Sequence, residues 1–225
     1  MAFQRAYTDE ATNLIYNLLF CDDPSLFKGG EGTPAKLLAM FKGAASEADL
    51  RAIAADANAS TRYRLLAMHE LRRKGAPVGE SVLLGAIVEA PMENGRDTLA
   101  AYADGSVRYI NQSGKMSFID APVPLLAEKI RDFLSEAAKM AGHLQPFRGE
   151  RMPAAKQGGP TRVTFLLSDG PRVGERPMDE IMHDSIGEPV IRAAAILLDG
   201  VVELTLGVQE GEAALQARQD AVGPL

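Results

Sequence analysis

The chain has 225 residues, of which 46% are hydrophobic and 24% are charged. This composition supplies one sizeable core and excludes a wholly disordered protein. The net charge of −6 disfavours general binding to the phosphate backbone of nucleic acids. The single cysteine, Cys21, excludes an internal disulfide and fits a reducing compartment.

The sequence contains no segment typical of a signal peptide or a transmembrane helix. Asp9 and Glu10 interrupt the N-terminus before any apolar stretch begins. The most apolar segment, residues 193–206, contains Asp199 and Glu203, whose charges disfavour insertion into a bilayer. We therefore expect a soluble cytoplasmic protein that does not associate with membranes.

Residues 1–77 predict a helical region. Leucine and isoleucine form an apolar stripe within residues 14–19, and Pro34 stands at a favourable first position of a second helix. A further helix is expected to begin at Ser60 and to end at Gly75, after three basic residues that suit the carbonyl end of a helix dipole.

The pattern changes near residue 80, where short apolar segments alternate with turn signals. Asp104-Gly105 is a typical two-residue hairpin turn, because both central positions of such a turn favour positive φ. The segments predict an antiparallel meander of four strands, at residues 82–88, 98–103, 107–111 and 116–119.

Beyond the meander the sequence predicts a helix, a loop and a fifth strand. Two prolines introduce a long helix over residues 122–141, and its apolar stripe is continuous. Residues 143–160, rich in glycine and proline, indicate an extended surface loop. Alternating apolar residues over 162–167 predict the fifth strand.

The last apolar segment leaves two alternatives open. The spacing of its apolar residues favours a helix from Pro189, although Gly200 inside a helix would cost roughly 1 kcal/mol relative to alanine. Alternatively, Asp199-Gly200 would form a turn into a strand over residues 201–206. Residues 208–225 are polar, and we expect them to form a frayed tail.

The predicted elements together indicate an α+β fold. A helical region (1–77) would precede the four-strand meander and fifth strand, which a long helix and a C-terminal helix would pack against. No long linker separates the two parts, so we expect residues 1–207 to form a single domain, of which 80–207 are the sheet and its packing helices. Whether residues 1–77 could fold independently stays open.

No motif of a nucleophilic, metal-dependent or nucleotide-binding enzyme occurs in the sequence. The three histidines lie in separate segments, without the spacing that builds a metal face. Cys21 follows a predicted helix and precedes two aspartates, and both features disfavour a thiolate. We therefore expect a buried structural cysteine, and we assign no catalytic residue, metal ligand or cofactor.

The segment 168–176 is the most suggestive of function, because it leaves the end of an apolar strand and is dense in glycine and charge. Its opposed charges could instead pair and merely order the loop. Polar residues near the ends of the meander strands complete a candidate binding set. The set consists of Asp104, Arg108, Tyr109, Asp169, Gly170, Arg172 and Glu175.

Three segments carry a resemblance: YNLLFCD at residues 16–22, DGSVRYINQSGK at 104–115 and TFLLSDG at 164–170. Together they resemble a family of uncharacterised bacterial proteins of similar length, collinear over most of the chain. The resemblance implies a bacterial origin and one co-inherited architecture, and it supports the final helix. It implies no activity, cofactor or site residue.

The sequence does not identify a biochemical activity. The lack of a catalytic motif favours a non-catalytic protein-interaction or regulatory protein, whose uncovered sheet edge would pair with a partner protein or a second copy. One alternative is an enzyme whose acids and bases converge only in three dimensions. Another is a small-molecule sensor with a cleft between the helical region and the sheet, near the 168–176 loop.

Overall fold

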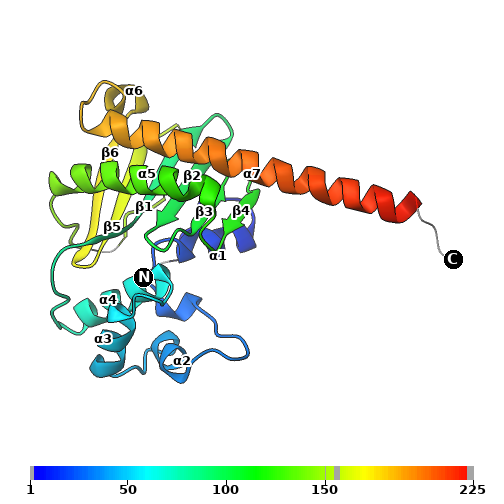
Figure 1. The fold of residues 1–225 in the computed structure, drawn as a ribbon. Helices are drawn as coiled ribbons and strands as arrows, with labels where there is room; N and C mark the ends of the chain where they lie inside the picture. The colour runs from blue at the N-terminus through cyan, green and yellow to red at the C-terminus, as the bar shows by residue number, and fades with distance from the viewer. Residues whose placement is uncertain (1–2, 150, 155–157, 222–225) are drawn as a thin grey trace.

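The computed structural model describes residues 3–149, 151–154 and 158–221, with the side chains of the last helix described as far as Leu206. It confirms the α+β class. An antiparallel sheet lies between two layers of helices, and a long C-terminal helix extends well beyond the sheet (Figure 1).

The N-terminal region is helical, as the sequence predicts. It comprises α1 (Glu10–Leu18), a 3-10 turn (Pro24–Leu26), α2 (Ala35–Phe41), α3 (Glu47–Ala55) and α4 (Thr61–Arg73). The Asp9 carboxylate accepts the Thr12 N–H at 2.7 Å, which satisfies a free donor at the start of α1. Helix α4 is capped from the sheet, because the Asp104 carboxylate accepts the Thr61 N–H at 2.7 Å. This bond joins the helical region to the first hairpin.

The predicted meander is confirmed, and the sheet has six strands. In space their order is β4-β3-β2-β1-β5-β6, and every neighbouring pair is antiparallel. The strands are β1 (Leu83–Met92), β2 (Gly95–Tyr102), β3 (Val107–Ile110), β4 (Met116–Ile119), β5 (Thr161–Leu167) and β6 (Gly170–Arg176).

Strand β6 corrects the prediction that residues 168–176 form a loop. Ser168 and Asp169 make a two-residue turn, after which Gly170 pairs with Leu167 and the chain runs back along β5 to Arg176. Gly170 has a φ of +129°, which favours glycine. Pro171 is tolerated because β6 is an edge strand. The glycines, proline and charges that suggested a loop thus belong to a short edge strand.

Three helices follow the meander: α5 (Pro124–Gly142), α6 (Met178–Ile181) and α7 (Gly187–Ala221). Residues 201–206 are helical, so the alternative strand is wrong and the favoured helix is confirmed. Where we expected a frayed tail from residue 208, the backbone is helical as far as Ala221, and residues 222–225 lie outside the described part.

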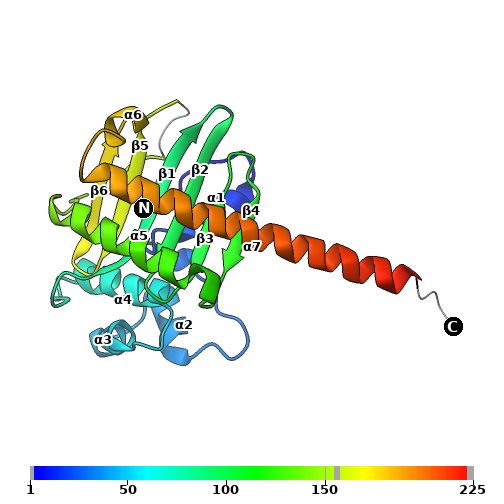
Figure 2. The same cartoon turned by 45° about the horizontal axis from the view of Figure 1, so that its top comes forward.

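Two hydrophobic clusters divide the interior, one on each face of the sheet. Helices α5 and α7 cover one face, where Phe133, Phe165 and Leu197 are fully buried. Helices α1 to α4 lie on the other face, where Tyr16 and Tyr102 are fully buried. The turned view in Figure 2 shows α5 and α7 crossing the same face of the sheet. The sheet is therefore the middle of three layers.

Within the described residues, no helix combines the length and the apolar composition needed to cross a membrane.

A candidate ligand-binding cavity

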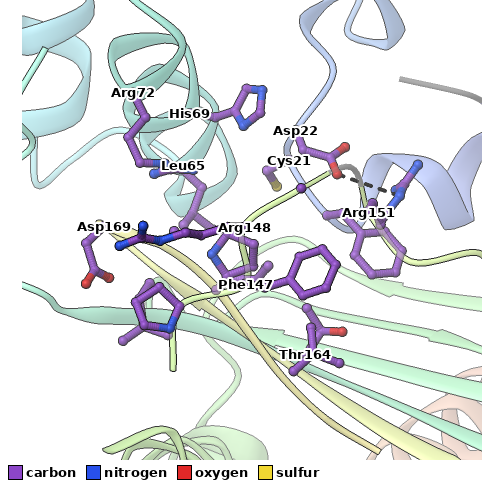
Figure 3. Close-up of a pocket in the computed structure, with 18 of the residues that line it drawn as sticks. Cys21, Asp22, Leu65, His69, Arg72, Phe147, Arg148, Arg151, Thr164 and Asp169 are labelled. Atoms are coloured by element: carbon purple, nitrogen blue, oxygen red, sulfur yellow. Dashed lines mark ion pairs between the residues drawn. The ribbon is translucent and has the colours of Figure 1, made fainter. Parts of the chain in front are cut away.

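A cavity of about 560 Å³ lies over strands β5 and β6, on the face of the sheet that helices α1 to α4 cover. Four segments surround it: the β5–β6 hairpin, helix α4, residues 20–22 after helix α1, and residues 146–149 and 151–152 of the connection from α5 to β5. The close-up in Figure 3 shows side chains from these separate segments converging on one space.

The two strands provide a mostly apolar floor. Alternation along β5 directs Thr164 and Leu166 to this face, and Val173 lies opposite Thr164 on β6. Arg162 belongs to the same row and is only 5% exposed. The floor therefore combines aliphatic surface with one buried guanidinium group.

Helix α4 forms a wall, because Leu65, His69 and Arg72 are spaced four and three residues apart and share a helix face. Arg72 Nη1 donates to the Ser168 carbonyl oxygen at 2.6 Å, which ties the helix to the β5–β6 turn. Burial, together with Arg72 and Arg73, lowers the pKa of His69 to about 4. The imidazole is therefore neutral at pH 7 and adds no charge to the cavity.

The chain after α1 brings Cys21 and Asp22 to the cavity. Cys21 is 2% exposed and has a φ of 53°, which is uncommon for a residue other than glycine. Its Sγ lies 3.6 Å from the Leu19 carbonyl oxygen, and burial raises the pKa of the thiol to about 12. The thiol thus stays protonated at neutral pH, and the prediction that Cys21 is buried is confirmed.

The connection between α5 and β5 covers the cavity. Phe147 N–H donates to the Pro171 carbonyl oxygen at 2.8 Å, which fixes this connection to the edge strand. Arg151 Nη2 donates to Asn17 Oδ1 at 2.6 Å, and its guanidinium lies 4.4 Å from the centre of the Phe20 ring. The described part of the predicted 143–160 loop therefore joins β6 to α1.

A buried ionic network lies beside the floor. Glu89, 1% exposed, accepts hydrogen bonds at Oε1 from Arg96 at 2.9 Å and from the Tyr16 hydroxyl at 2.8 Å. Arg162 lies 3.7 Å from the other Glu89 oxygen and donates to Glu175 at 2.9 Å. Each buried charge has an opposite neighbour, which holds Arg162 in place, although Glu89 Oε2 and Arg162 Nε have no hydrogen-bond partner among the described residues.

The cavity is positively charged although the whole chain is acidic. Among the described residues that line it are five arginines and two aspartates, so in this part of the chain positive groups outnumber negative groups by three. Figure 3 shows Arg72, Arg148 and Asp169 on one side of the cavity and the Asp22–Arg151 pair on the other. The side chains thus combine an apolar floor with a cationic rim.

The structure brings part of the predicted binding set to this cavity. Asp169 and Gly170 line it, and Glu175 contacts Arg162 beside it. Arg172 lies on the opposite face of β6, where Nη1 donates to the Ala141 carbonyl oxygen of α5 at 3.1 Å. Arg172 also pairs with Asp169 at 3.2 Å, so opposed charges do pair in this segment.

The other three predicted residues lie elsewhere and have structural contacts. Asp104 caps α4, and although burial opposes its ionisation, hydrogen bonds from Ser106 and Thr61 lower the pKa of its carboxyl. Arg108 donates to the Ile119 carbonyl oxygen at 3.0 Å and pairs with Asp120, beside a separate polar hollow of about 450 Å³.

Tyr109 lies on the α5–α7 face of the sheet, where its hydroxyl donates to Asp97 at 2.8 Å. Burial and this hydrogen bond raise the pKa of Tyr109. The candidate set is thus divided among three places.

The arginines that dominate the cavity are not part of the predicted binding set. Arg72 and Arg73 were explained by the dipole of their helix, and Arg148 and Arg151 lie in a segment interpreted as a surface loop. One available signal was the spacing of Leu65, His69 and Arg72, which places two polar groups on the face of α4 that carries buried leucines.

Among the residues that the structure describes, no three histidine, cysteine, aspartate or glutamate side chains gather closely enough to hold a metal ion. No protein family and no curated protein matches this chain. The resemblance to a bacterial family therefore stays a prediction.

Proposed function

We propose that this protein binds a small molecule in the cavity between α4 and strands β5 and β6, and that it acts as a sensor or carrier rather than as an enzyme. The observation that carries this proposal is the cavity itself, with about 560 Å³ enclosed by four segments that are distant in sequence. A volume of this size matches the range typical of small-molecule sites.

The chemistry of the lining supports binding rather than catalysis. Cys21 would need a lowered pKa to act as a nucleophile, and its pKa is raised to about 12. His69 would need a pKa near the working pH to act as an efficient general base, and its pKa is lowered to about 4. The arginines suit recognition and orientation of a ligand.

A thermal-shift screen with a panel of small metabolites tests this proposal. A ligand that binds only the folded protein, present at 100 times its Kd, stabilises it by about 2.7 kcal/mol. The melting temperature should therefore rise by several degrees. Val173→Trp, which places an indole over the floor, should abolish the rise.

Val202→Trp is the matched control, because Val202 is 40% exposed on α7, away from the cavity. It should leave the ligand-induced rise unchanged. A panel that produces no rise, or a rise that survives Val173→Trp, would contradict the proposal.

Self-association is the second candidate function, and one observation favours it. Helix α7 exposes large apolar side chains: Ile196 is 48% exposed, Val202 40% and Leu206 55%. Such side chains could contact a second copy of the chain or a partner protein. Gel filtration that returns the mass of one chain would count against it. The lone cysteine also supports a cytoplasmic location, and the three resembling segments support a bacterial origin.

A further inference from the structure

We propose, resting on the proposed function, that the ligand carries an anionic group, a carboxylate or a phosphate, bound by Arg72 and Arg148 at one end of the cavity. The remainder of the ligand would be apolar and would lie on the floor.

The other three arginines of the cavity are paired with carboxylates. Arg151 pairs with Asp22 at 3.6 Å, and Arg73 pairs with Glu70 at 3.1 Å. Arg162 donates to Glu175 at 2.9 Å and is also flanked by Glu89. The positive charge of each is therefore balanced within the protein.

Arg72 has no ion-pair partner of this kind. No carboxylate of the described residues lies within ion-pair distance of it, and burial lowers the pKa of its guanidinium, although Asp169 acts on it from farther away in the opposite direction. Asp169 itself already accepts hydrogen bonds from Ser81 at 2.7 Å and from Arg172 at 3.2 Å. Because Asp169 compensates this partly buried cation only from beyond ion-pair distance, an anion placed directly beside Arg72 is stabilised.

Arg148 supplies the second unpaired cation. It is exposed, and within the described part of the chain it has no ion-pair or hydrogen-bond partner. Figure 3 places Arg148 and Arg72 on the same side of the cavity. Guanidinium groups bind carboxylate and phosphate oxygens through paired N–H donors, which makes an arginine pair suited to either group.

The apolar surface near these arginines indicates the rest of the ligand. Leu65 and Leu166 are buried, and Phe147 and Val173 are half-buried around the same space. A hydrocarbon or aromatic group placed there would be transferred out of water, and this transfer supplies most of the binding energy of small-molecule sites. The cavity thus fits a molecule with one charged end and an apolar body.

Two dyes with the same aromatic skeleton test this inference by fluorescence titration. 8-Anilinonaphthalene-1-sulfonate carries an anionic group, and N-phenyl-1-naphthylamine lacks it. We expect the anionic dye to bind at least about tenfold more tightly, since a charge-assisted hydrogen bond contributes at least that factor. Arg148→Met should remove most of this advantage and change the affinity of the neutral dye less than about twofold.

Arg148 is exposed, so Arg148→Met should fold normally, and a melting curve checks this. Arg176→Met is the matched control, because Arg176 is an exposed arginine at the end of β6 whose side chain belongs to the other face of the sheet. It should leave the affinities of both dyes unchanged.

Competition against the anionic dye distinguishes the two sources of charge. Displacement by phenyl phosphate more strongly than by phenylacetate assigns a phosphate ligand, and the reverse order assigns a carboxylate ligand. If neither displaces the dye better than benzyl alcohol, or if Arg148→Met leaves the dye preference intact, the inference is wrong. In that case, neutral-dye binding that Val173→Trp abolishes would still support the proposed function, whereas neutral-dye binding that survives Val173→Trp would contradict it.

Discussion

The two faces of the sheet are packed in different ways. Helices α5 and α7 cover one face with aliphatic and aromatic side chains, among which Phe133, Phe165 and Leu197 are fully buried. The opposite face buries charged and polar groups from the same strands, including Glu89 and Arg162. One face therefore resembles an ordinary core, and the other combines a core with a polar site.

This difference follows from how far the N-terminal helices reach. Their apolar cluster includes sheet residues of β1, β2 and β3, and from β5 only Leu166, which also lines the cavity. Over β5 and β6 the cover consists largely of the connection through Phe147 and Arg151, which leaves the cavity beneath it. The candidate site therefore lies where the packing of helices on the sheet is replaced by a loop.

The largest expected effect comes from matched phenylalanine truncations on the two faces. Phe165→Ala should lower the free energy of unfolding by about 3–5 kcal/mol, because it opens a cavity in a fully buried core. Phe147→Ala should lower it by less than about 1 kcal/mol, since Phe147 is only half-buried and its backbone bond to Pro171 remains. Urea denaturation measures both values.

Equal losses for the two variants would contradict the comparison, because they would mean that the connection over the cavity is packed as tightly as the core. The urea midpoints of the two variants can be compared directly only if the slope of unfolding free energy against urea concentration stays constant, because only then does a shift of the midpoint report a change in stability.

A smaller effect is expected from His69 as the pH falls. Its pKa is about 4 in the folded protein, below the usual value of about 6.5 in an unfolded chain. Between these values the unfolded state binds a proton that the folded state does not, so the stabilisation present above pH 6.5 is lost as the pH falls towards 4. The loss between pH 7 and pH 5 should be about 2 kcal/mol.

His69→Gln should flatten this part of the pH profile, as measured by the difference in unfolding free energy between pH 7 and pH 5. Comparing this difference between the two proteins, instead of their unfolding free energies at one pH, removes the pH-independent cost of the substitution. A wild-type profile that His69→Gln leaves unchanged, or an NMR titration of His69 near pH 6.5, would contradict the placement of this imidazole in a desolvated wall beside Arg72 and Arg73.

Most of the fold could be predicted from local patterns. The meander was predicted because each strand is short and is followed by a turn signal such as Asp104-Gly105. The expected two-residue turn is wrong in detail, because only Gly105 has a positive φ and the connection between β2 and β3 is longer. Strand β6 was missed because its stability comes from pairing with β5, and its own residues, including Pro171 and Gly174, have low strand propensity. At this edge of the sheet, pairing with β5 therefore outweighs the low intrinsic strand propensity of the β6 residues.

The candidate site was much less predictable. Asp169 and Gly170 were found because a turn at a strand end is a local feature. Asp104 and Arg108 meet the same criterion, but Asp104 accepts the Thr61 N–H of α4 and Arg108 donates to the Ile119 carbonyl oxygen, so both have structural contacts. The cavity depends on how α4 and the connection after α5 meet over β5, and nothing in the sequence near Arg148 specifies that meeting.

The smallest expected effect concerns Gly200, on the covered face. The sequence suggested that this glycine only weakens its helix, whereas in the structure α7 crosses α5 at this point. A Cβ atom added at Gly200 would lie 2.8 Å from Leu126 Cδ2 and 3.0 Å from Lys129 Cδ. Leu126 is fully buried and has little room to move, although Lys129 does.

Gly200→Ala therefore gains about 1 kcal/mol of helix propensity and loses about 1–3 kcal/mol by overpacking. We expect a net loss of stability of about 1 kcal/mol, measured by thermal or urea unfolding. Gly142→Ala is the matched control, because Gly142 is also helical, has no atom within 4 Å of an added Cβ, and should be neutral or stabilising. If Gly200→Ala stabilises the protein as much as Gly142→Ala does, the two helices are not closely packed, and the contrast between a tightly covered face and an open one loses its main support.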